Sequence, residues 1–125
     1  MSLIIGGEDI ITRIRKRLVI NEEIEAAFNI CACICGKDGI ISREEEEAIT
    51  QKFKSAFNLC VEDINTLFDR FFESKVQIDN YVNVITDKEL QRLIVDISEF
   101  SAAADGMDVR ENIALQRTKL LWGLD

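Results

Sequence analysis

The sequence predicts an all-α fold: a compact bundle of six or seven helices forming one domain over residues 1–125. Three observations support this prediction. The chain contains no proline, the residue that interrupts helices most strongly. Apolar residues recur with helical spacing almost throughout, and no stretch alternates convincingly between apolar and polar residues. An Asp-Gly turn followed by a helix-capping sequence occurs twice, which suggests two pseudo-repeated helical hairpins.

The first helices follow in order from the N-terminus. A short amphipathic segment, with Ile10, Ile14 and Leu18 on one face, predicts a helix near the start. Residues 22–35, with Asn21 as N-cap, predict a longer helix that is apolar around most of its circumference. A helix of that kind lies in the middle of a bundle.

The remaining helices are expected at residues 42–57, 61–73, 79–85 and 108–122, with one more before the second Asp-Gly turn. The stretch 76–85 is rich in β-branched residues, but we assign 79–85 to a short helix. The helix before the second turn is the clearest, with apolar or small residues at Leu90, Leu93, Ile94, Ile97, Phe100, Ser101 and Ala104.

Thr86 and Glu89 form a candidate capping box at the start of this clearest helix, and Asp105-Gly106 ends it. The same turn occurs earlier as Asp38-Gly39. After the first turn comes Ser42-x-x-Glu45, and after the second comes Asp108-x-x-Glu111. Both are capping boxes, in which the first side chain and the glutamate satisfy free N–H groups of the new helix.

Composition excludes several classes of function. The formal net charge is −8, so we expect no nucleic-acid partner. Because the chain has no histidine, histidine-dependent triads and mixed Cys/His zinc sites are excluded. We also find no glycine-rich phosphate loop, activated nucleophile or cofactor motif, and we predict that the protein is not an enzyme. With neither a signal peptide nor a membrane-length apolar run, the expected location is cytoplasmic.

Three of the four cysteines lie at alternate positions, Cys31, Cys33 and Cys35. Successive helical residues are rotated by about 100°, so Cys31 and Cys33 point about 160° apart and do not share one ion. We expect these three to pack as small hydrophobic residues. Cys60 lies in an expected turn and is a candidate reactive thiol.

The acidic residues of the two turns admit two interpretations. If the turns pair face to face, five carboxylates converge and offer the oxygen ligands that Ca²⁺ or Mg²⁺ prefers: Asp38, Glu45, Asp105, Asp108 and Glu111. A complete EF-hand is excluded, because Ile34 and Gly36 stand where its first two acidic ligands would be. Alternatively the acids are only caps, since a carboxylate in the first turn stabilises a helix by ~0.3–1 kcal/mol.

Two charged segments are candidate interaction surfaces. Glu44, Glu45, Glu46 and Glu47 form either a solvated first turn or an acidic docking patch for a basic protein partner. The segment 10–18, with Arg13, Arg15, Lys16 and Arg17, either docks on the bundle or rests on an anionic membrane surface. Trp122 is expected in the core or in a subunit contact of a homodimer.

The segments "KDGIISREEEEAI" and "AAADGMDVREN" resemble the two turns of the TerB-like family, named for bacterial tellurite-resistance proteins and also found fused to some co-chaperones. The closing "LLWGLD" is similar to the family's tail, and the resemblance covers residues 22–125. It implies about seven helices with the two Asp-Gly turns close together, and a suggested divalent-ion role for the acids. The chain departs from the family pattern at Gly36-Lys37, where alanine is usual, and in a second turn one residue shorter.

The resulting hypothesis is a non-catalytic cytosolic module that acts through protein–protein contacts. The resemblance places it in a stress-response, tellurite-resistance-like or envelope-associated bacterial system, where a partner can be membrane-associated. The alternative is a regulator that binds Ca²⁺ or Mg²⁺ through the acidic turns.

Overall fold

A computed structural model describes residues 22–36, 41–73 and 79–124 of the chain. These residues are all-helical, with no strand among them. The elements, in order, are α2 (Glu22–Cys35), α3 (Arg43–Phe57), α4 (Val61–Glu73), the short α5 (Asp79–Val82), α6 (Lys88–Ala102), the 3₁₀ turn η1 (Ala103–Asp105) and α7 (Val109–Leu121). The helix expected at residues 10–18, the cap at Asn21 and the first Asp-Gly turn lie outside the described residues.

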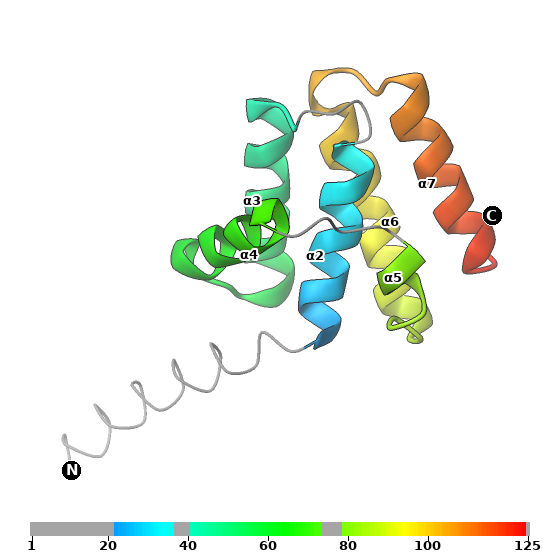
Figure 1. Cartoon of the computed structure of the whole chain (residues 1–125), viewed down its shortest axis with the longest axis horizontal. Helices are drawn as coiled ribbons and strands as arrows, with labels where there is room; N and C mark the ends of the chain where they lie inside the picture. Colours follow the sequence, from blue (N-terminus) through cyan, green and yellow to red (C-terminus); the bar gives the residue numbers. More distant parts are fainter. Residues whose placement is uncertain (1–21, 37–40, 74–78, 125) are drawn as a thin grey trace, which may run out of the picture.

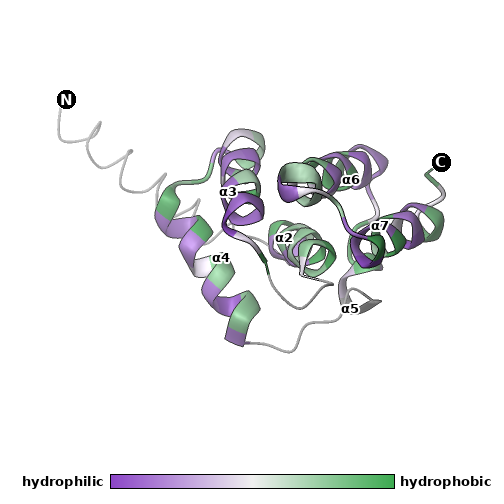
Figure 2. Ribbon diagram, turned by 90° about the horizontal axis from the view of Figure 1, so that it is seen from above, coloured by the Kyte–Doolittle hydropathy of each residue, from purple (hydrophilic) through white to green (hydrophobic). Residues whose placement is uncertain are grey.

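Helix α2 is the centre of the bundle, as its apolar circumference predicts. It contacts α3, α4, α5, α6 and α7, which surround it in the view of Figure 2. Every residue from Ala26 to Cys35 is buried. Its Phe28 makes edge-on ring contacts with Phe53 of α3 and Phe68 of α4, at centroid distances of 5.3 and 4.8 Å. Such pairs contribute roughly 0.5–1.5 kcal/mol beyond the area that they bury.

The C-terminus of α2 and the N-terminus of α3 lie at the same end of the bundle as the junction of α6 with α7 (Figure 1). Turn η1, which closes α6, packs against both α6 and α3. After it, Gly106 adopts a φ of 92°, a conformation that is strained for residues with a Cβ. The first turns of α3 and α7 therefore lie at the same end of the bundle, although they are far apart in sequence.

Both predicted capping boxes at these first turns are confirmed, at Ser42 and Glu45 for α3 and at Asp108 and Glu111 for α7. The capping box expected at Thr86 is wrong. Helix α6 begins at Lys88, and its N-cap is Asp87, whose side chain accepts from the Glu89 N–H at 3.3 Å. A carboxylate at this position also interacts favourably with the positive end of the helix dipole.

Three further details correct or decide the sequence predictions. Helix α5 ends at Val82, earlier than expected. Phe100 and Ala104 are exposed, and the Lys52 ammonium lies 4.3 Å from the Phe100 ring centroid. Trp122 belongs to the core: it is buried, and its indole N–H donates to the Val82 carbonyl at 3.0 Å.

None of the helices within the described ranges combines the length and apolar character needed to cross a membrane.

Candidate functional site

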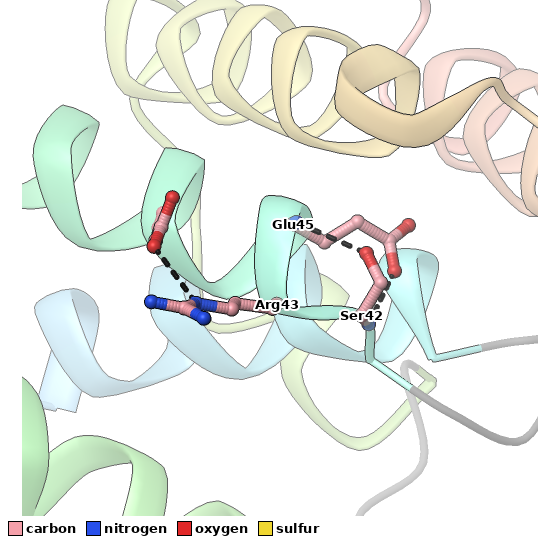
Figure 3. A network of polar contacts seen from close by, with 4 residues as sticks. Ser42, Arg43 and Glu45 are labelled. Carbon is pink, nitrogen blue, oxygen red and sulfur yellow. Dashed lines mark hydrogen bonds and ion pairs between the residues drawn. The ribbon is translucent and has the colours of Figure 1, made fainter.

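The candidate site is the end of the bundle where α3 and α7 begin. At α3, the Ser42 hydroxyl accepts from the Glu45 N–H at 3.1 Å, and Glu45 Oε1 accepts from the Ser42 N–H at 2.9 Å (Figure 3). Glu45 is only 1% exposed. The reciprocal bonds hold its carboxylate under the turn, and the inward-facing Ala48 and Ile49 lie one turn further along the same side of the helix.

The start of α7 repeats this arrangement with an aspartate cap. Asp108 Oδ1 accepts from the Glu111 N–H at 2.9 Å, and Glu111 Oε1 accepts from the Asp108 N–H at 3.0 Å. Glu111 is also 1% exposed. Two capping glutamates are thus buried at one end of the bundle, although carboxylates are uncommon in buried positions.

One oxygen of the α3 box has no hydrogen-bond partner. Glu45 Oε2 is fully buried and receives no hydrogen bond, whereas Oε1 is used for capping. A buried polar atom left without a partner destabilises a fold by roughly 1–3 kcal/mol. This atom is therefore the clearest candidate in the site for contact with a further group.

The Cys35 thiol lies among the site carboxylates. Burial is the main cause that raises its pKa above the ordinary value, followed by Cys31 and then by the negative charges of Glu45, Glu111 and Asp105. The structure therefore brings these three predicted site residues around one buried thiol, and a thiol there stays protonated. Cys35 is not among the site residues that the sequence predicts; its place at the end of α2, directly before the first turn, is the signal that points to it.

The other predicted metal ligands do not complete a coordination shell within the described part of the chain. Asp108 is committed to capping through Oδ1, and Asp38 lies outside the described residues. Across residues 22–36, 41–73 and 79–124, no group of three or more Asp, Glu or Cys side chains has a spacing suited to a metal ion. The ion-binding interpretation of the five acids therefore stays a prediction.

The acidic patch expected at Glu44–Glu47 has to be corrected at one position. Glu44, Glu46 and Glu47 are exposed, but Glu45 faces the core because the capping box turns it inward. Glu47 forms an ion pair with Arg43 at 3.2 Å, and both side chains are largely in solvent, so the pair contributes little stability. Beside the patch is a shallow depression of about 500 Å³, lined by Glu46, Glu47, Thr50, Gln51, Lys54 and Ser55.

The cysteines of α2 pack as predicted: Cys31, Cys33 and Cys35 are all free and buried. Cys31 Sγ accepts from the Ser98 hydroxyl at 3.1 Å, and burial raises the pKa of the Cys31 thiol to about 12. Cys60 is exposed, yet its thiol donates to Asp63 Oδ2 at 3.0 Å. This hydrogen bond raises the pKa of Cys60 and thus lowers its reactivity as a nucleophile.

Chemically, the site can cap two helices, exclude water from two carboxylates and present the exposed acids of α3 to solvent. Comparison with known proteins adds no assignment: the chain matches no protein-family model, no curated protein and no solved structure.

Proposed function

We propose that this chain is a non-catalytic protein-interaction module of TerB type, built from two related helix–turn–helix hairpins and acting in a cytoplasmic stress-response system. The observation that supports it best is the outer side of the first turn of α3. Glu44, Glu46 and Glu47 are exposed in a turn that is fixed by a capping box, and Glu46 and Glu47 line the depression on the same helix. Fixed carboxylates beside a concave surface favour a basic partner segment, because complementary charges steer encounter and set orientation.

Charge reversal tests this proposal. The triple variant Glu44→Lys, Glu46→Lys, Glu47→Lys is expected to lose partners that the wild-type chain recovers from lysate, as measured by affinity capture and mass spectrometry. The matched control is Glu23→Lys, Asp69→Lys, Asp96→Lys, which changes the net charge equally at exposed sites on other helices. Circular dichroism checks that both variants fold. Equal recovery by the two triples, or no specific partner of the wild-type chain, would count against the proposal.

A second candidate function is Ca²⁺ or Mg²⁺ binding through Asp38, Glu45, Asp105, Asp108 and Glu111. The specific observation in its favour is the buried Glu45 Oε2, which has an unused lone pair, while the charges of Glu45, Glu111 and Asp105 all act on the Cys35 thiol. Binding to the folded state stabilises it by RT ln(1 + [L]/Kd), or about 2.7 kcal/mol at a hundredfold excess over Kd. The melting temperature in millimolar Ca²⁺ or Mg²⁺ should then be higher than that in chelator, and Glu45→Gln should remove the difference. An identical melting temperature with and without ion excludes this candidate.

A further inference from the structure

A second pocket lies at the opposite end of α2 from the capping turns, where the start of α2 meets the end of α4 and the short α5. Its volume is about 370 Å³, which is within the range of small-molecule sites. The lining residues are Glu22, Glu25, Asn29, Arg70, Glu73 and Tyr81. None of them belongs to the capping turns or to the α3 patch.

The amide of Asn29 indicates what kind of group the pocket accepts. Asn29 is 4% exposed, and its Oδ1 has no hydrogen-bond partner. A buried amide oxygen without a donor is unfavourable, and a ligand that brings an N–H or O–H group relieves this. The pocket therefore favours a hydrogen-bond donor.

The charges around Asn29 give the sign of the ligand. Three carboxylates line the pocket against one guanidinium, so it has two net negative charges. The guanidinium is that of Arg70, whose Nη1 lies 3.3 and 3.4 Å from the two oxygens of Glu25. One cationic group is thus already accommodated at this wall, while Glu22 and Glu73 remain exposed. An anion would be repelled, and a cationic donor is favoured.

The spacing of the carboxylates distinguishes between kinds of cation. Among the described residues, no three acidic or thiol side chains are close enough together to hold one metal ion, and this includes the three glutamates of the pocket. A compact divalent ion needs several oxygens at about 2.0–2.6 Å, whereas an alkylammonium or guanidinium contacts acceptors that are spread along its length. Tyr81 adds a half-buried aromatic wall, against which an aliphatic chain or a cation packs favourably.

We propose that this pocket binds an organic cation with N–H donors, in which an ammonium or guanidinium group reaches Asn29 and the glutamates. Two sources present this chemistry: a free polyamine, or a lysine or arginine side chain. The chain's own Arg13, Arg15, Lys16 and Arg17 are one source of the second kind, since they precede Glu22 by five to nine positions in the sequence.

Calorimetric titration of the full chain with spermidine at physiological ionic strength tests this site. Saturable binding is expected, and Glu22→Gln with Glu73→Gln should weaken it by about tenfold or more, equivalent to about 1.4 kcal/mol. The control Glu44→Gln with Glu46→Gln removes the same charge from the α3 patch and should change affinity by less than about twofold. All four positions are exposed, so neither pair is expected to disturb the fold. Asn29→Leu tests the buried acceptor separately.

A variant with Arg13, Arg15, Lys16 and Arg17 all replaced by serine separates the sources. Tighter spermidine binding by this variant identifies the chain's own basic side chains as the competing occupant. Saturable spermidine binding that is unchanged in this variant identifies an external amine as the ligand of the pocket. The proposal is overturned if neither this variant nor the wild type binds spermidine saturably, or if both glutamine pairs weaken binding equally, because diffuse surface charge then explains the effect. Partner capture through the α3 patch is a separate readout, so failure here leaves that proposal independently testable.

Discussion

The first turns of α3 and α7 have the same internal hydrogen bonds and opposite outer surfaces. In each, a side-chain cap and a buried glutamate exchange bonds with the backbone at 2.9–3.1 Å. On the outside, α3 presents Glu44, Glu46 and Glu47. The start of helix α7 instead presents apolar and basic residues. Val109 is 75% exposed, Arg110 follows it and is also exposed, and Ile113, one turn further along, is 61% exposed.

This difference shows which part of each turn is constrained by folding. The inner half must cap a helix and fill the end of the core, and Ser or Asp with Glu three residues later does this in both turns. The outer half has no such task and differs in charge and polarity. Interaction specificity is therefore expected on the outer residues, and stability on the inner ones.

Among the single substitutions, the largest effect is expected from removing a buried capping glutamate. Glu45→Ala and Glu111→Ala each remove a reciprocal hydrogen bond and leave a void, and should lower the free energy of unfolding by about 1–3 kcal/mol. Glu45→Gln should cost less, because the amide keeps the acceptor for the Ser42 N–H. Urea unfolding measures all of these variants. If alanine destabilises one turn and not the other, the two turns are not structural counterparts.

The caps themselves should have the next largest effect. Ser42→Ala and Asp108→Ala are each expected to lower stability by about 1 kcal/mol. Only Asp108 adds a charge at the helix N-terminus, so its effect should fall as salt is raised, while that of Ser42 stays constant. Denaturation at low and high ionic strength measures the difference, and equal salt dependence of the two variants would contradict it.

Most of this inner architecture was predictable from the sequence, and the reasons are local. The bounds of α2 and α4 agree with the predicted ranges because hydrophobic period and flanking turns coincide there. The burial of Glu45 and Glu111 was also predictable from the sequence, because each precedes an inward-facing Ala by three residues and an inward-facing Ile or Leu by four. The features that periodicity could not show depend on how the helices pack together. The exposure of Phe100 depends on where neighbouring helices stop, and the Asn29 pocket depends on how α4 and α5 meet α2.

Alkaline pH should weaken the core beneath both turns. Burial raises the pKa of the Cys31 thiol from its ordinary value of 9.0 to about 12, so the folded state keeps a proton that the unfolded state loses above pH 9.0. The associated stability is complete below pH 9.0 and is lost as pH rises through that window towards about 12. The slope is about 1.4 kcal/mol per pH unit for each such thiol. Urea unfolding across this range should show a shallower decline in Cys31→Ala than in the wild type, and identical slopes would refute the assignment.

The smallest effects on stability should come from the outer residues, where the two turns differ most. Glu46→Ala on α3 and Val109→Ser on α7 should each change the free energy of unfolding by no more than about 0.5 kcal/mol, since both side chains are mainly in solvent. The same substitutions alter charge on one surface and apolar area on the other, so any change in association belongs to the surface and not to the fold. Urea unfolding combined with sedimentation separates the two contributions. A loss of stability as large as that of Glu45→Ala would mean that the outer half of the turn is also constrained by folding, and the division between inner and outer residues would fail.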